Sequence, residues 1–186
     1  MVVTHGFVLP VRGAHALTIG NFDGVHLGHQ AMLKRVVAQA RALGVESCAL
    51  TFEPHPREFF APDVAPARLS RLREKLELIA ASGIEHVHVA RFDARFASLA
   101  PERFVEQVVV HGLRTAWLLV GGDFRYGARR VGDFASLERA AHAHGFELEA
   151  MPEVKLGGER ISSSAVREAL LAADFPDAER LLGRPY

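Results

Sequence analysis

Hydrophobic residues along this chain change their spacing repeatedly, and each change marks an expected boundary between a strand and a helix. Short apolar runs, which are typical of buried strands, occur five times. They cover residues 15–20, 46–52, 85–90, 115–121 and 146–151. Between these runs, apolar residues recur every three or four positions, as they do on one face of a helix.

The expected helices end at glycines, because glycine readily adopts the left-handed conformation that follows a last helical turn. Gly44, Gly83, Gly112 and Gly145 stand at these positions. The helices before them are expected over 26–43, 70–82, 101–111 and 133–144, and two shorter helices over 162–173 and near 174–183. The Pro-rich segment 53–66 is expected to be a loop.

Strands that alternate with helices across short joints predict a parallel sheet covered by helices on both faces. We therefore expect an α/β fold, a Rossmann-like parallel sheet of about five strands, in one domain that covers residues 1–186. Ligands of such sheets bind beyond the carboxyl ends of the strands. The loops that follow the strands are therefore the first places to search for chemistry.

Composition narrows the class of protein further. Of the 186 residues, 49% are hydrophobic, and 22 basic side chains balance 22 acidic ones. This balance argues against a nucleic-acid or anionic-membrane partner, which would need a strong positive field. The single cysteine, Cys48, excludes an internal disulfide framework and fits a reducing, cytoplasmic setting. The N-terminus lacks a basic region followed by a long apolar run, and no apolar run approaches eighteen residues, so we expect neither a secretion signal nor a membrane span.

Two histidines lie close together just after the first expected strand, in "TIGNFDGVHLGHQ" (18–30). If a helix begins near Val25, His26 and His29 share one face of it. Gly28 leaves space for a ligand close to the backbone, and the free amides of a first helical turn favour an anion. The segment therefore predicts a phosphate site. Two unrelated surface histidines, or a zinc site that includes Asp23, are the alternatives.

Four segments together resemble a known enzyme family. "GNFDGVHLGH" is similar to the first signature of the HxGH nucleotidyltransferase superfamily, and "ISSSAVR" (161–167) is similar to the second. "TFEPHP" (51–56) and "GGDFRYG" (121–127) further resemble the adenylyltransferase module of prokaryotic bifunctional riboflavin kinase/FAD synthetases. The sequence departs from the family pattern at Ser164, where Thr is frequent, and at Tyr126, where Phe is frequent.

The resemblance implies that ATP and FMN are the substrates, with Mg²⁺ as cofactor and FAD and pyrophosphate as products. The FMN phosphate would attack the α-phosphorus of ATP directly. The chain ends about where the kinase domain of the family begins, so we expect that domain to be absent and riboflavin to stay unphosphorylated. The alternatives are an adenylyltransferase for nicotinamide mononucleotide or phosphopantetheine, and a flavin- or nucleotide-binding module without turnover. The sequence does not indicate an oligomeric state.

The resemblance also assigns site residues, and it assigns no protein ligand to a metal. The expected catalytic residues are His26, His29, Asp123 and Arg167. The expected ATP-phosphate contacts are Gly20, Asn21, Phe22, Asp23, Gly24, Gly28, Ser162, Ser163 and Ser164. The expected flavin contacts are Pro54, His55, Pro56, Phe59, Phe124, Arg125 and Tyr126. Simpler interpretations exist for several of them: the serine run suits a helix cap, Phe124 and Tyr126 suit a core, and "EPHP" suits a rigid turn. His86, His88, His142 and His144 receive no role.

Overall fold

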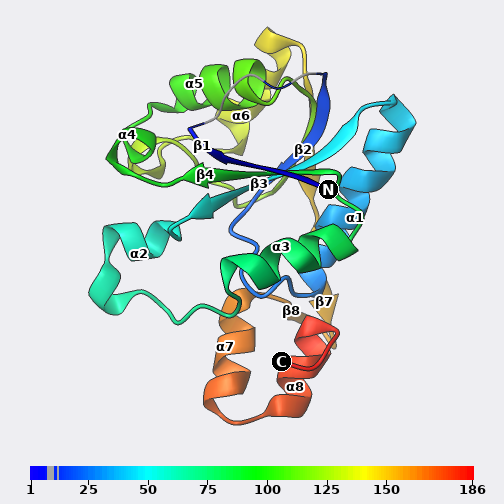
Figure 1. The fold of residues 1–186 in the computed structure, drawn as a ribbon, viewed down its shortest axis with the longest axis vertical. Helices are drawn as coiled ribbons and strands as arrows, with labels where there is room; N and C mark the ends of the chain where they lie inside the picture. The colour runs from blue at the N-terminus through cyan, green and yellow to red at the C-terminus, as the bar shows by residue number, and fades with distance from the viewer. Residues whose placement is uncertain (8–10, 12) are drawn as a thin grey trace.

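The computed structural model describes residues 1–7, 11 and 13–186, and it contains one large parallel sheet (Figure 1). The strands of this sheet are β1 Val2–Gly6, β2 His15–Ile19, β3 Glu46–Glu53, β4 His86–Arg91, β5 Thr115–Gly121 and β6 Glu147–Met151. Their order across the sheet is β1-β4-β3-β2-β5-β6, and every neighbouring pair is parallel. The predicted α/β fold is confirmed.

Helices cover both faces of the sheet, as predicted (Figure 1). One face carries α1 Leu27–Leu43 and α3 Leu72–Ala81, and the other carries α4 Ala94–Ala97, α5 Pro101–Phe104, the π-helix η2 Val105–Gly112 and α6 Phe134–His144. The remaining elements are α2 Pro56–Phe60, the 3₁₀ turns η1 Pro62–Val64 and η3 Ala128–Arg130, the hairpin β7 Lys155–Leu156 and β8 Glu159–Arg160, and the helix pair α7 Ser163–Leu171 and α8 Phe175–Leu182. No helix in these described ranges is both long enough and apolar enough to cross a membrane.

Alternate residues of the central strands supply the two cores. In β2, Ala16 packs under α1 and α3, whereas Leu17 packs under α5, η2 and α6. Cys48 is fully buried in the second of these cores, as expected of a small strand residue. Burial raises the pKa of its thiol well above the usual value. Each strand is therefore apolar on both sides, which explains its continuous hydrophobic run.

Three predictions about the elements need correction. The sheet has six strands, because β1 pairs with β4 at the edge from Val2↔His86 to Gly6↔Ala90. The expected loop 53–66 contains α2, which starts with Pro56 in its first turn and a capping box between His55 and Glu58. The expected α-helix 101–111 is α-helical only in its first turn and continues as η2, whose wider winding accompanies the burial of several neighbouring valines.

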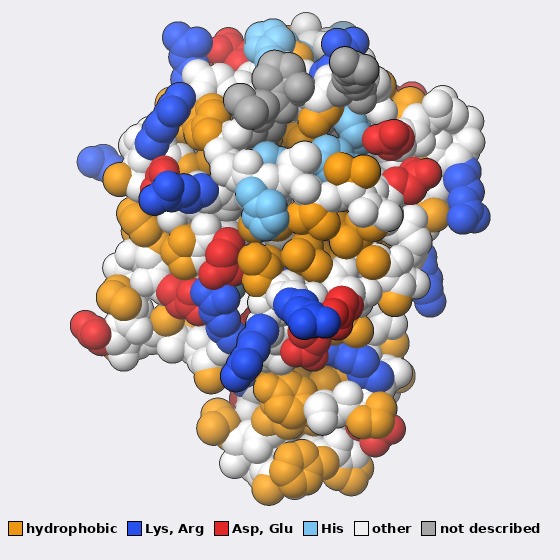
Figure 2. Space-filling view, viewed as in Figure 1, with side chains coloured by type: hydrophobic (Ala, Val, Ile, Leu, Met, Phe, Trp, Pro, Cys, Tyr) orange, Lys and Arg blue, Asp and Glu red, His pale blue; other side chains and the backbone are white. Residues whose placement is uncertain are grey.

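The order in which the chain forms the strands reverses at the middle of the sheet, at β2. From β2 the chain builds outward through β3 and β4, and it then crosses to β5 and β6 on the opposite side of β2. A crevice for ligands forms at such a reversal, beyond the carboxyl ends of the strands. The helix pair α7–α8 lies next to this end and has a small core of its own, and hydrophobic side chains gather on its surface (Figures 1 and 2).

Candidate functional site

A cavity of about 420 Å³ opens where the loops after β2 and β5 face each other. It brings together residues from the loop after β2 with the first turns of α1, from the loop after β5, and from the stretch between the end of β6 and the start of α7. The predicted site residues that line it are Gly20, Phe22, His26, Gly28, His29, Asp123, Phe124 and Ser162. Three segments that are far apart in the sequence (19–32, 121–124 and 151–162) therefore meet at the reversal point of the sheet.

His26 caps the N-terminus of α1 with its own side chain. The helix begins at Leu27, one residue after the start of the expected range 26–43, and Val25 precedes the cap with a positive φ of 41°. The backbone N–H of His29 donates to Nδ1 of His26 over 3.3 Å. A neutral His26 therefore carries its proton on Nε2. Burial lowers its pKa to about 4, with Asp23 opposing the shift and Arg160 reinforcing it, so the ring is neutral at pH 7.

His29 lies directly against His26. The two rings stack with their centroids 3.7 Å apart, and Phe22 meets His29 edge-on at 5.2 Å. Burial, followed by the nearby charges of His26 and Lys75, lowers the pKa of His29 well below its ordinary value. Its Nδ1 is inaccessible and has no hydrogen-bond partner among the described residues. The cavity wall thus carries two neutral imidazoles at the positive end of a helix dipole.

Gly28 keeps the backbone open between the two rings. A Cβ atom on Gly28 would lie 3.1 Å from the His26 ring and 3.6 Å from the carbonyl oxygen of Ile161. Contacts at the shorter distance force the ring to move. The absence of a side chain therefore allows His26 to fold back onto the first turn of α1.

The opposite wall carries a small group of charges. Arg160 donates to the Asp123 carboxylate at 2.8 Å and lies 3.4 Å from the Glu153 carboxylate. The hydrogen bond from Arg160 lowers the pKa of Asp123. Sequence reasoning missed Arg160, although it directly precedes the "ISSSAVR" segment. Ser162 accepts from Ala165 N–H at 3.1 Å, so its hydroxyl caps α7 in this structure.

Asp23 and Arg167 are paired with each other outside the residues that line the cavity. Asp23 is buried and accepts hydrogen bonds from the backbone N–H groups of Leu69 and Ser70. Arg167 Nη2 donates to the same carboxylate, and its Nε donates to the carbonyl oxygen of Ala67 at 2.7 Å. The pair joins α7 to the loop after β2. The predicted contact of Arg167 with phosphates would require it to leave these partners.

The remaining phosphate-site candidates surround this pair. They are Asn21 and Gly24 in the loop after β2, and Ser163 and Ser164 in the first turn of α7. Asn21 accepts from the Thr51 hydroxyl through its backbone carbonyl at 3.2 Å, and Ser163 donates to the Asp23 carbonyl at 3.0 Å. None of the four lines the cavity.

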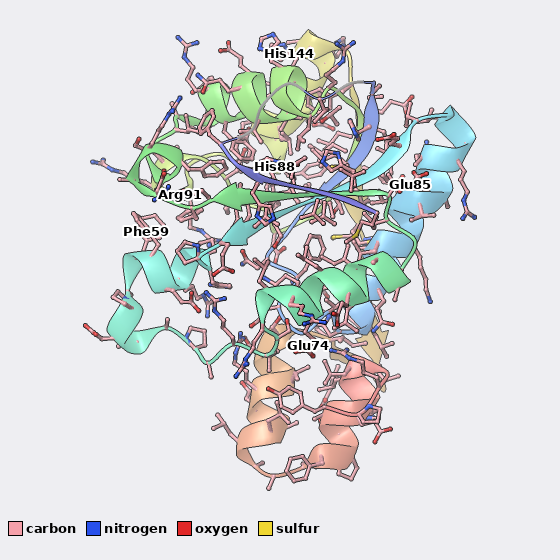
Figure 3. The ribbon with its side chains drawn as sticks, viewed as in Figure 1. Phe59, Glu74, Glu85, His88, Arg91 and His144 are labelled. Atoms are coloured by element: carbon pink, nitrogen blue, oxygen red, sulfur yellow. The ribbon has the colours of Figure 1, made fainter. Side chains whose placement is uncertain are left out.

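Only one of the expected flavin contacts, Phe124, lines the cavity. Tyr126 is 5% exposed within the core, and its hydroxyl lies 3.1 Å from Ser136 Oγ, so the core interpretation describes its place here. Arg125 is exposed and donates to the Phe124 carbonyl. The other candidates, Pro54, His55, Pro56 and Phe59, follow β3. Phe59 lies on α2 at the carboxyl end of the sheet, where it packs edge-on against Phe92 (Figure 3).

A second cation was missed because it is on the buried face of a helix. Lys75 of α3 is 4% exposed, and its ammonium group makes no hydrogen bond or ion pair with any described residue. Burial lowers its pKa, and the charges of Asp23 and Glu53 oppose this shift. Its charge also contributes to the lowered pKa values of His29 and His55. Lys75 is therefore a buried cation close enough to influence both the histidine pair and the loop after β3.

Comparison with known proteins adds independent information. The model of the FAD synthetase family matches residues 10–165. Proteins named bifunctional riboflavin kinase/FMN adenylyltransferase are 49% identical in Pseudomonas fluorescens, 48% in Escherichia coli K12 and 44% in Haemophilus influenzae. Each match covers 95% of this chain, and the chain spans only 59–60% of the length of these relatives. A crystal structure of a macrolide-efflux protein from Streptococcus pneumoniae shares the fold. Its TM-score is 0.87 at 21% identity, over all of this chain and 62% of that one.

Proposed function

This chain belongs to the FAD synthetase family, and from that premise we propose that it transfers AMP from ATP to the phosphate of FMN. The products are FAD and pyrophosphate. The observation that supports this proposal most directly is the cavity between β2 and β5. It combines two neutral imidazoles at a helix N-terminus with an arginine on the facing wall. This set of donors suits a phosphate chain that gains negative charge as a leaving group departs.

The chemistry places few demands on acid–base groups. A phosphate monoester has a second pKa near about 6 and is largely dianionic at pH 7. One of its oxygens forms a new bond to the α-phosphorus of ATP, while the bond from that phosphorus to the bridging oxygen of the β-phosphate breaks. No proton has to be removed from the nucleophile. The protein therefore contributes positioning and charge neutralisation.

The neutral state of the histidines suits this task. We assign the Nε2–H of His26 and the ring of His29 to the triphosphate, beside the free amides of the first turn of α1. A neutral imidazole donates a hydrogen bond without first having to acquire a proton in a buried place. Arg160 pairs with Asp123 and Glu153 in the free protein. A bound phosphate would compete with these carboxylates for its guanidinium group.

Mg²⁺ belongs to the proposal as well. Asp123 and Glu153 are the oxygen donors of the cavity wall that would hold it, together with substrate phosphates and water. When bound, the ion neutralises charge on the phosphates. Both carboxylates pair with Arg160 in this structure. The protein residues alone thus form an incomplete shell, which fits an ion that arrives with ATP.

Phe124 is the aromatic side chain that we assign to the flavin most directly, because it lines the same cavity. We also keep the residues after β3 (Pro54, His55, Pro56 and Phe59) as proposed flavin contacts. Asp123 and Arg167 are kept as proposed catalytic residues. We also propose a cytoplasmic setting, which the single buried cysteine fits. The longer relatives carry riboflavin kinase in their names, and we propose that in such proteins this region is joined to a kinase domain.

One experiment tests the function. The purified chain is incubated with ATP, Mg²⁺ and, separately, FMN, nicotinamide mononucleotide, phosphopantetheine or riboflavin. Pyrophosphate release and product are followed by chromatography. We expect FAD and pyrophosphate in equal amounts from FMN only. Turnover with another phosphate acceptor would replace FMN in the proposal, and tight FMN binding without pyrophosphate would favour the non-catalytic module. FMN formed from riboflavin would reveal a second activity.

A further inference from the structure

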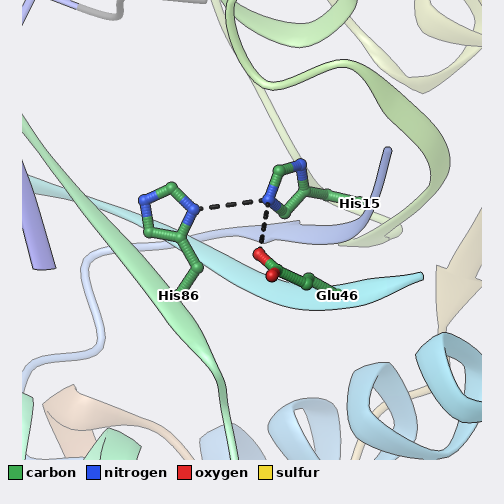
Figure 4. A group of neighbouring side chains, drawn as sticks. All are labelled: His15, Glu46 and His86. Atoms are coloured by element: carbon green, nitrogen blue, oxygen red, sulfur yellow. Dashed lines mark hydrogen bonds and ion pairs between the residues drawn. The ribbon is translucent and has the colours of Figure 1, made fainter. Parts of the chain in front are cut away.

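A second group of histidines lies at the opposite end of the sheet, where the central strands begin. His15, Glu46 and His86 are the first residues of β2, β3 and β4, which are neighbours in the sheet (Figure 4). His15 Nε2 is 3.3 Å from His86 Nδ1 and 3.5 Å from Glu46 Oε2. Both histidines are buried, whereas the Glu46 side chain is 62% exposed. An ion can therefore reach the group from the Glu46 side.

Hydrogen bonds fix the proton of His15. Its Nδ1 lies 2.8 Å from the carbonyl oxygen of Leu113, which can only accept. Nδ1 therefore carries the proton, and a neutral His15 has a bare lone pair on Nε2. This is the nitrogen that faces His86 and Glu46.

Hydrogen bonds through Thr4 and His88 also fix where His86 carries its proton. Figure 3 labels His88. His88 Nε2 lies 3.3 Å from the Gly6 carbonyl, so it is the protonated nitrogen, and His88 Nδ1 accepts from the Thr4 hydroxyl at 2.7 Å. Thr4 Oγ1 then accepts from His86 Nε2 at 2.9 Å. His86 Nδ1 is left with a bare lone pair, and it faces His15 Nε2.

This hydrogen-bond network, from the Leu113 carbonyl to the Gly6 carbonyl, is one hydrogen short. It has five contacts in a row, from the Leu113 carbonyl to the Gly6 carbonyl, and each contact needs one hydrogen. Three neutral imidazoles and one threonine hydroxyl supply only four. Two lone pairs therefore face each other over 3.3 Å, and reversing the Thr4 hydroxyl moves the conflict to His88 without removing it. A cation between His15 and His86 satisfies the network.

The geometry favours a metal ion over a proton. Four ligands held about 2.0–2.1 Å from Zn²⁺ in a tetrahedron are about 3.3–3.4 Å apart, close to the spacings of 3.3 and 3.5 Å found here. The three ligand atoms all lie within 4.8 Å of one another. Two imidazole nitrogens and a carboxylate form a usual zinc set.

We propose that His15 Nε2, His86 Nδ1 and the Glu46 carboxylate bind one divalent transition-metal ion of the Zn²⁺ type, with water as a fourth ligand. The carbonyl of Leu113 and the hydroxyl of Thr4 hold the two rings from behind, as outer partners of metal-bound histidines commonly do. The ion joins the starts of three adjacent strands. Its role is structural, because the proposed substrate cavity lies beyond the other ends of the strands.

The test uses the full chain, freed of metal with a chelator and then titrated with Zn²⁺ against a coloured competing chelator. We expect one tightly bound Zn²⁺ per chain and a higher midpoint of thermal unfolding. With Co²⁺ we expect the intense visible absorption of a tetrahedral site. Glu46→Gln replaces an exposed side chain, so folding is preserved. We expect it to weaken Zn²⁺ binding by more than the roughly 10- to 100-fold that loss of an outer partner costs, because a direct ligand is lost, and to remove most of the thermal shift.

Two control variants separate this site from other histidines. The double variant His142→Ala/His144→Ala removes two histidines from the end of α6, where Figure 3 labels His144. The double variant His26→Asn/His29→Asn removes the pair at the cavity. Both should keep the tight Zn²⁺ site. The proposal is overturned if the wild-type chain takes up no Zn²⁺ with a thermal shift, if Glu46→Gln binds as well as wild type, or if binding disappears with His26 and His29.

Discussion

Replacing Arg167 with alanine should destabilise the fold as well as weaken ATP binding. The guanidinium group donates to the Asp23 carboxylate and to the backbone carbonyls of Ala67 and Ser163. Its side chain is 16% exposed, and that of Asp23 is 4% exposed. The contacts with Asp23 and Ala67 connect α7 to the loop after β2 and to the segment before α3, and the contact with Ser163 lies within α7. Their loss therefore affects the packing of the C-terminal helix pair.

The structure indicates the size of the effect. Breaking a buried ion pair by removing one partner costs about 3–5 kcal/mol, because a buried charge is left unpaired. Asp23 would keep its hydrogen bonds from the backbone of Leu69 and Ser70, so the low end of this range, about 3 kcal/mol, applies. For a chain of this length, 1 kcal/mol shifts the unfolding midpoint by about 2–4 °C. We therefore expect Arg167→Ala to unfold roughly 6–12 °C below wild type.

The assay is thermal unfolding followed by circular dichroism, with urea titrations at 25 °C for the free energy. Arg73→Ala is the matched control, because Arg73 is 92% exposed and pairs only with Glu77. It should stay within about 0.5 kcal/mol of wild type. Arg167→Lys should recover part of the loss, since an ammonium group cannot reproduce three guanidinium contacts. Adding Asp23→Ala to Arg167→Ala should cost less than the two separate losses combined.

Two results would refute different parts of this reasoning. If Arg167→Ala unfolds at the wild-type temperature, the contacts with Asp23 and the two carbonyls do not stabilise the fold. If it unfolds early and its KM for ATP is unchanged at a temperature where it is folded, the proposed role of Arg167 on the terminal phosphates is wrong. An increase in KM together with the lower midpoint supports both roles.

Three further predictions concern the first turns of α1. His29→Ala should lower kcat by roughly 10²- to 10³-fold, the usual loss for a preorganised donor, and a near-wild-type rate in a steady-state FAD assay would contradict its role. Gly28→Ala gains about 1 kcal/mol of helix propensity but displaces the His26 ring that caps α1, so we expect the unfolding midpoint to change little. The substitution should nevertheless lower kcat, since its Cβ displaces the His26 ring; unchanged turnover would show that the ring position is unimportant. His26→Asn keeps a capping oxygen but cannot be protonated. The pKa of His26 is about 4 in the fold and near 6.5 unfolded, so its stabilisation is present above pH 6.5 and is lost as pH falls towards 4. Between pH 7 and 4.5, urea unfolding should therefore show a loss about 2 kcal/mol smaller in the variant than in wild type, and parallel losses would contradict the low pKa.

Much of the fold could be predicted because its strands are buried on both faces. Strands such as β3 then appear as uninterrupted apolar runs, and Gly44 and Gly145 end their helices in the left-handed conformation that the sequence suggests. The edge strand β1 is partly exposed, and its sequence "VVTHG" carries no such run. It forms because β4 offers a free edge, which is information that local sequence does not contain.

The candidate site shows the same limit. His26, Gly28 and His29 could be identified because they lie within one short segment, where spacing and a helix start suffice. Arg160 and Lys75 reach the region from β8 and α3, and only the folded chain shows that they lie near these histidines. Tyr126 shows that position after a strand does not fix where a side chain points. Its segment follows a strand at the correct end of the sheet, but the ring turns into the core.

The same side chain can serve opposite ligands at the two ends of this sheet, because the neighbouring backbone decides where the imidazole proton lies. At the cavity, an amide of α1 donates to Nδ1 of His26, so the outward nitrogen carries hydrogen and suits an anion. At the other end, the carbonyl of Leu113 accepts a hydrogen bond from His15 Nδ1, which keeps the proton there, and the inward nitrogen is left bare and suits a cation. An amide at a helix N-terminus thus prepares a histidine for phosphate, and a carbonyl at the start of a strand prepares one for metal.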